Sequence, residues 1–453
     1  MTAAFLAPLA ASAASAAIAS PGAFDSDFAA PLQMSDMTAP SFKVAWGGGV
    51  EAPNAQDAAQ NAVTPPNVAP DTPESNGRLK LKPLLDARYR LEYVDQDGFE
   101  RNAVANTLSA RFGFELQAGE AFTFLVEGEG VANLSGRFNS TTNGATQFPV
   151  VADPDEIELN RAQLTFTGIE NTAVTVGRQK INHADQRFLG AVAFRQNSQT
   201  FDGVRVKTQP TKNLSVDYAY IGRVHRILGD GNPSGNFNGD SHVADTTYKI
   251  GKTGSVSGYA YLLDFEEAPG LSSATVGMRA EKSLPLGGDV KLTMRGAYAR
   301  QWEYGDNPSD YAVSYGKAEA AVGLAPITMA ASYERLGGDG ANAFQMPLAT
   351  LHKFQGFADV FLTTPTSGID DVRLAAIYKR KDVGPFKAVK AVLAVHDFSA
   401  AQGGADLGQE IDFVLNGKVN KHLTAELKGG RYFGPDMGPA SRGRFWFAVS
   451  YAL

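Results

Sequence analysis

Hydrophobic and polar residues alternate along most of the chain after position 77. In residues 78–94, for example, Leu85 and Leu91 fall on one face of the alternation, while Arg88 and Arg90 fall on the other. Successive side chains point to opposite faces of a β-strand, whereas in a helix the same charges would be spread around the whole cylinder. The pattern therefore predicts strands that are apolar on one face and charged on the other.

Eighteen segments show this alternation, and we predict an all-β fold. The predicted strands are residues 78–94, 105–117, 121–135, 157–168, 172–179, 200–208, 213–223, 242–250, 254–265, 273–283, 288–301, 310–323, 326–336, 369–379, 385–398, 408–416, 421–431 and 442–453.

The connections between these strands alternate in length. Short connections such as 118–120 and 169–171 follow the even-numbered strands, and longer ones such as 180–199 and 337–368 follow most odd-numbered strands. A soluble β-sandwich gives no reason for this sorting, whereas an outer-membrane barrel has short periplasmic turns and long outer loops. We therefore predict a transmembrane antiparallel up-and-down β-barrel of about 18 strands.

The last predicted strand, residues 442–453, places an apolar residue at every second position from Phe445 to Leu453. We expect it to pair with the first strand, because an open sheet edge is not tolerated in hydrocarbon. The same alternating end resembles the C-terminal signal that the barrel-assembly machinery recognises in outer-membrane proteins, so that machinery is an expected partner.

The first 77 residues lack the alternation. Residues 1–19 are apolar and alanine-rich and end in the cleavage-type motif Ala17-Ile18-Ala19, which predicts a signal peptide. The alternative is a low-complexity tail, since no basic residue precedes Lys43. Residues 20–77 are rich in proline and acidic residues and are interpreted as a flexible periplasmic linker, followed by the barrel at 78–453.

Composition argues against the common catalytic and metal sites. The chain has no cysteine, which excludes a thiol nucleophile and Cys-ligated metals, and its six histidines show no paired ligand spacing. The Asp- and Asn-rich stretch 229–240 lacks the closing Glu of a calcium loop and is interpreted as an outer loop. We therefore expect no enzymatic activity, no cofactor and no bound metal.

Tyrosine and tryptophan residues are expected at the membrane interfaces, on the outward face near strand ends. These residues include Tyr89, Tyr93, Tyr259, Tyr261, Trp302 and Trp446.

Two stretches carry a family resemblance. Residues 177–206 read GRQKINHADQRFLGAVAFRQNSQTFDGVRV, and residues 343–365 read AFQMPLATLHKFQGFADVFLTTP. Both resemble the alginate export family of outer-membrane channels, the first through its GRQ strand end, D-Q-R loop and returning F-D-G strand. The resemblance implies an eighteen-stranded barrel with an arginine-rich constriction.

Basic residues outnumber acidic residues on the predicted inward face, which indicates a wet bore with a positive potential. Arginine is suited to repeated contact with carboxylates because its planar fork binds them in a bidentate way. The alternative is that these residues pair with inward acids and only keep the wall hydrated. The predicted pore-lining residues are Arg88, Arg90, Arg111, Arg161, Arg178, Arg187, Arg195, Arg205, Arg295, Arg373 and Lys428.

These expectations together favour a channel in the bacterial outer membrane for passive diffusion of anionic solutes, with uronate-containing saccharides implied by the resemblance. The alternatives are a weakly selective general porin, an outer-membrane barrel enzyme, and a structural barrel plugged by residues 180–199 or 337–368. Expected partners are outer-membrane lipid, lipopolysaccharide and the anionic solute, and no nucleic acid.

Overall fold

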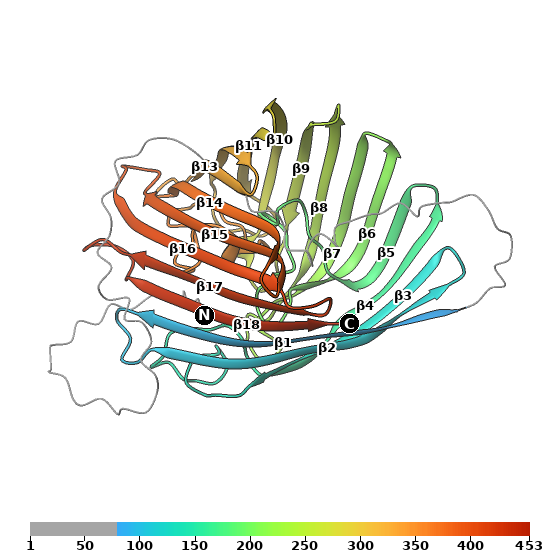
Figure 1. Cartoon of the computed structure of the whole chain (residues 1–453), viewed down its shortest axis with the longest axis horizontal. Helices are drawn as coiled ribbons and strands as arrows, with labels where there is room; N and C mark the ends of the chain where they lie inside the picture. Colours follow the sequence, from blue (N-terminus) through green and yellow to red (C-terminus); the bar gives the residue numbers. More distant parts are fainter. Residues whose placement is uncertain (1–78) are drawn as a thin grey trace, which may run out of the picture. The chain divides into compact units, whose positions relative to one another are not determined.

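The computed structural model describes residues 79–453, which form one closed antiparallel barrel of 18 strands. Each strand pairs with its neighbours in sequence order, and β1 (Lys80–Gln96) also pairs with β18 (Arg442–Ala452) (Figure 1). In that closing pair, Arg90 lies opposite Ala448 and Glu92 lies opposite Trp446. The predicted pairing of the last strand with the first is confirmed. The predicted signal peptide 1–19 and linker 20–77 lie outside the described residues.

The strands are β1 (Lys80–Gln96), β2 (Ala103–Ala118), β3 (Phe122–Asn133), β4 (Glu156–Ile169), β5 (Thr172–Gln179), β6 (Thr200–Thr211), β7 (Leu214–His225), β8 (Asn236–Ile250), β9 (Gly254–Leu263), β10 (Ser273–Gly287), β11 (Val290–Glu303), β12 (Ala312–Leu324), β13 (Ile327–Leu336), β14 (Ile369–Val383), β15 (Phe386–Ser399), β16 (Asp406–Lys418), β17 (Leu423–Phe433) and β18 (Arg442–Ala452). The 3₁₀ turns η2 (Pro269–Leu271) and η3 (Leu351–Lys353) lie in connections between strands. Between residues 79 and 453, no helix has the length and hydrophobicity needed to cross a bilayer.

The predicted set of strands is confirmed, and β8 shows the largest difference at a strand end. It begins at Asn236 rather than near residue 242, so part of the predicted outer loop 229–240 is strand. The backbone N–H and side-chain amide of Asn238 both donate to the Glu267 carboxylate, and the side chain of Asn236 donates to Asp230. These polar side chains find hydrogen-bond partners in neighbouring residues, so the strand can extend beyond its apolar part.

The two faces of the wall differ as the alternation predicts. Leu81 is 67% exposed and Phe112 is 62% exposed on the outer face, whereas Arg90 and Arg111 are buried on the inner face. A bilayer would cover the outer side chains, since hydrocarbon takes the place of a protein core around a membrane barrel.

Three of the residues expected at the membrane interface lie on the inner face instead. Tyr259, Tyr261 and Trp446 are buried, so their predicted outward position is wrong. The reason is that chain segments fold into the bore and give inward aromatic side chains an apolar partner. Phe188 lies 5.0 Å from Tyr259 and Phe194 lies 5.5 Å from Trp446, measured between ring centroids.

The first of these segments, residues 180–199, connects β5 to β6 and contacts distant parts of the wall. His183 lies within hydrogen-bonding distance of the Tyr261 hydroxyl on β9, at 3.3 Å, and Arg187 donates to Glu334 on β13 at 2.9 Å. Its other end reaches β2, where Arg111 donates to the hydroxyl of Ser198 at 3.0 Å. The 180–199 segment therefore spans the bore.

The second segment, residues 337–368, connects β13 to β14 and packs against the first. The backbone N–H of Gly190 donates to the carbonyl of Leu348 at 2.9 Å, which joins the two segments. On β16, Glu410 accepts a 2.6 Å hydrogen bond from the backbone of Ala358. An apolar cluster that includes Leu189, Phe344 and Leu348 fills the space between the segments and the wall, so the expected wet interior is wrong for this part of the bore.

Candidate functional site

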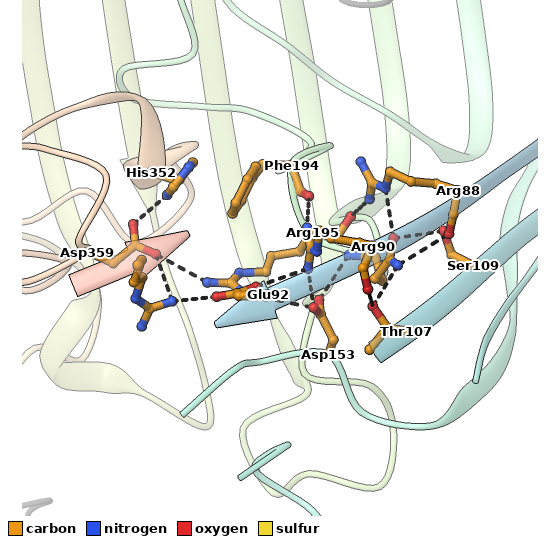
Figure 2. A network of polar contacts seen from close by, with 12 residues as sticks. Arg88, Arg90, Glu92, Thr107, Ser109, Asp153, Phe194, Arg195, His352 and Asp359 are labelled. Atoms are coloured by element: carbon orange, nitrogen blue, oxygen red, sulfur yellow. Dashed lines mark hydrogen bonds and ion pairs between the residues drawn. The ribbon is translucent and has the colours of Figure 1, made fainter. Parts of the chain in front are cut away.

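The arginines of β1 hold the 180–199 segment against the inner wall. Arg88 donates from Nη1 to the carbonyl of Ala193 at 2.9 Å and from Nε to the side chain of Gln196 at 2.7 Å. Arg90 donates from Nη1 to the carbonyl of Phe194 at 2.6 Å, and Figure 2 shows both arginines directed toward this segment. Alternate residues of one strand thus bind consecutive carbonyl groups of the chain that crosses the bore.

A buried ionic network continues from these arginines and joins three connections of the barrel to its wall. Arg90 also pairs with Asp153, which comes from the connection between β3 and β4. Glu92 accepts from Arg195 at 3.1 Å, and Arg195 donates in turn to Asp359 of the 337–368 segment at 3.2 Å (Figure 2). All five side chains are almost fully buried, so each charge depends on its partners.

Arg444 of β18 closes the network at the seam between the first and last strands. Its Nη1 lies 2.9 Å from Glu92 and 3.4 Å from Asp359. Glu92 therefore bridges cations from β18 and the 180–199 segment, and Asp359 binds the same two cations.

Aromatic and histidine rings stack beside the ionic network. Phe194 and His352 are parallel, with ring centroids 3.5 Å apart (Figure 2). Burial lowers the pKa of His352 to about 3, so its imidazole is neutral and donates from Nδ1 to Asp359 at 2.7 Å. The predicted residue Lys428 lies here as well, with Nζ 3.5 Å from the ring centroid of Phe357 and 4.8 Å from that of Phe194.

Most of the other predicted cations pair with carboxylates. Arg111 binds Glu129 at 2.7 and 2.9 Å, and Arg295 bridges Glu281 at 2.6 Å and Glu319 at 2.7 Å. Arg373 lies on β14, paired in register with His396 of β15. Arg161 forms a bidentate pair with Glu127, and Arg205 forms one with Asp217.

Arg178 differs from the other predicted pore-lining residues because its side chain does not face the bore. It alternates with the buried Gln179, so it lies on the outer face of β5 and donates to Asp202 at 2.8 and 3.1 Å. The prediction that it lines the bore is therefore wrong. The strand is too short and weakly patterned in sequence to show which of two adjacent polar residues faces inward.

Sequence reasoning missed several members of the network. Asp153, His352 and Asp359 lie in connections without periodicity, and nothing in their local sequence shows that they enter the bore. Asn160 was missed because a register shift in the β3–β4 pairing lets it and Arg161 both bind Glu127. Within residues 79–453, no group of three or more histidine, cysteine or acidic side chains has the arrangement of a metal site.

Comparison with known proteins agrees with this architecture. Residues 81–226 match the family described as Alginate export. Three solved structures from Pseudomonas aeruginosa are similar, and the match covers 82% of this chain in each case. OpdO has a TM-score of 0.63 and 17% sequence identity over 97% of its own chain, and the outer membrane protein OprD has a TM-score of 0.61 and 15% identity over 94% of its chain. OpdK with vanillate has a TM-score of 0.63 and 13% identity over 98% of its chain.

No match was found among the curated proteins. The family match covers β1 to β7, the part of the wall that carries most of the predicted arginines, and the structural matches cover the barrel. The chain therefore has the barrel fold of these three proteins, and residues 81–226 are similar to the Alginate export family.

Proposed function

We propose that the barrel is a passive diffusion channel for anionic solutes, with uronate-containing saccharides as the solute class, and that it catalyses no reaction. The proposal rests on the concentration of basic residues in the first part of the barrel. Seven of the predicted cations lie between residues 81 and 226, on the inner wall or in the 180–199 segment: Arg88, Arg90, Arg111, Arg161, Arg187, Arg195 and Arg205.

The chemistry of these arginines suits carboxylate solutes. Bidentate pairs with Glu127 and Asp217 hold the guanidinium groups of Arg161 and Arg205 in one orientation. Both arginine side chains also line an open cavity. A positive potential along a bore with low-dielectric walls attracts anions and raises their local concentration. OpdK, which has the same fold, is described with vanillate, an aromatic carboxylate, and this supports anions as the solute class.

A plugged structural barrel is the second candidate, and one observation favours it. The 180–199 and 337–368 segments contact the wall on β1, β9, β13 and β16 and bury an apolar cluster between them. A barrel closed by these segments would show no conductance, whereas a channel conducts around them or when they move.

Single-channel recording in planar bilayers tests the proposal. We expect oligouronates to interrupt the current in proportion to their concentration, while neutral oligosaccharides of the same length do not. Arg205→Gln should weaken the interruption, because it removes an inward cation, while Arg178→Gln serves as the matched control on the outer face. A silent protein, or equal responses to charged and neutral oligosaccharides, would contradict the proposal.

A further inference from the structure

A cavity of about 190 Å³ lies on the inner wall at β4, β5 and β6. Two inward residues of β5 are small, with Ala173 opposite Lys207 and Thr175 opposite Arg205 in the pairing with β6. The neighbouring strands carry long side chains, so the short residues of β5 leave a hollow between them. The full lining is Arg161, Gln163, Ala173, Thr175, Gln179, Lys180, Arg205 and Lys207.

The charges around this cavity do not balance. Its lining contains four cations, Arg161, Lys180, Arg205 and Lys207, and no carboxylate. Two carboxylates lie behind the lining, Glu127 bound to Arg161 and Asp217 bound to Arg205. When both lysines are protonated, four positive and two negative charges leave an excess of two positive charges.

The two lysines carry that excess. Lys207 Nζ lies 3.8 Å from Asp217, but both oxygens of that carboxylate already accept from Arg205. Asp217 also lies 3.6 Å from Nε2 of His183. Lys180 makes no ion pair within 4.0 Å in the described part of the chain, and its backbone carbonyl faces Arg205 Nη1 at 3.5 Å. Each lysine can therefore still bind an anion.

We propose that this cavity is a binding site for one compact, doubly charged anion. This deepens the proposed function, on which it rests for passage, by giving the channel a preference for solutes with two neighbouring negative charges over single carboxylates. A monoanion would leave one lysine charge uncompensated, whereas a dianion cancels the excess.

The fixed and the mobile parts of the lining have separate roles in this site. The bidentate pairs hold the arginine forks in one geometry, which lowers the entropy lost when an anion accepts their remaining N–H groups. The flexible lysine ammonium groups can move onto ligand oxygens, and the side chains of Gln163 and Thr175 offer neutral donors. The cavity is large enough for a small hydrated anion.

Titration calorimetry on the full chain in detergent tests the site, with sulfate as the dianion and acetate as the monoanion at matched ionic strength. We expect wild-type protein to bind sulfate at least about tenfold more tightly than acetate, which corresponds to about 1.4 kcal/mol. Lys180→Gln and Lys207→Gln should each weaken sulfate binding about tenfold, because each removes one charge-assisted contact. The double variant should bind the two anions equally.

Lys291→Gln is the matched control, since Lys291 lies on β11, away from the cavity, and should leave sulfate binding unchanged. Equal binding of sulfate and acetate by the wild type, or wild-type sulfate affinity in both cavity variants, would overturn the inference. Circular dichroism of the variants should match the wild type, because each change removes repulsion among cations.

The same variants separate this inference from the proposed function. Sulfate binding in a protein that does not select anions in bilayers supports the site and counts against the channel proposal. Anion selectivity in a wild-type protein without sulfate preference supports the channel proposal and overturns the site.

Discussion

Replacement of Arg195 by alanine should loosen the segments that fill the bore while leaving the barrel wall intact. Arg195 lies in the 180–199 segment and donates to Glu92 at 3.1 Å and to Asp359 at 3.2 Å. It contacts both β1 and the 337–368 segment through these two carboxylates. Its loss removes a contact of the bore contents and leaves the β1–β18 pairing unchanged.

The size of the expected free-energy change follows from the burial of Glu92 and Asp359, the two partners of Arg195. Removing one member of a buried ion pair costs about 3–5 kcal/mol, because the other charge stays buried without its partner. Arg444 and Arg90 still lie 2.9 and 3.6 Å from Glu92, so we expect the lower end of that range. A change of about 3 kcal/mol shifts the equilibrium between the docked and released segments about a hundredfold.

Single-channel recording measures this shift directly. We expect Arg195→Ala to raise the mean conductance and the frequency of large opening events, while the thermal unfolding temperature of the barrel changes little. Arg300→Ala is the control, because Arg300 is exposed on the outer face of β11 and donates to the hydroxyl of Ser314. Conductance and opening events identical to those of the wild type would refute the reasoning.

Three further changes test other parts of the structure. Phe112→Arg places a charge on the lipid face, and the free energy of unfolding in lipid should fall by about 2–4 kcal/mol, whereas an unchanged value would show that this face is not in hydrocarbon. Gly356 has a φ of +82° and lies against the Glu410 carboxyl, where an added Cβ would approach to 2.3 Å, so Gly356→Ala should release the 337–368 segment and increase its cleavage by proteases. Burial and, to a lesser extent, the charge of Arg111 lower the pKa of Lys180 to about 7. The lysine gains its charge as the pH falls, so sulfate should bind more tightly at pH 6 than at pH 8 by calorimetry, and equal affinities would contradict this assignment.

The wall of the barrel could be predicted from sequence because one physical constraint acts on every strand. Each strand must show apolar residues to lipid and can show polar residues to the bore, so a period of two runs through segments such as 78–94 and 442–453. The alternation of short and long connections then predicted the up-and-down order of the strands. Strand ends shifted where local hydrogen bonds extend the pairing, as at Asn236 and Asn238 of β8.

The contents of the bore could not be predicted in the same way. The contact between Arg195 and Asp359 joins residues 164 positions apart, and neither lies in a periodic segment. Because the 180–199 segment brings aromatic residues inward, it also changed the environment of Tyr259 and Tyr261, which the membrane-interface rule had placed outside. The basic composition of the bore was visible in sequence, but the partner of each arginine was not.

A closed wall of 18 strands surrounds the bore, and we propose that this bore passes anions. The reversal potential of purified protein in a planar bilayer under a potassium chloride gradient measures this most directly. We predict a reversal potential of the sign that shows chloride to be more permeable than potassium. A potential near zero, one of the opposite sign, or the absence of any conductance would show that the bore does not favour anions.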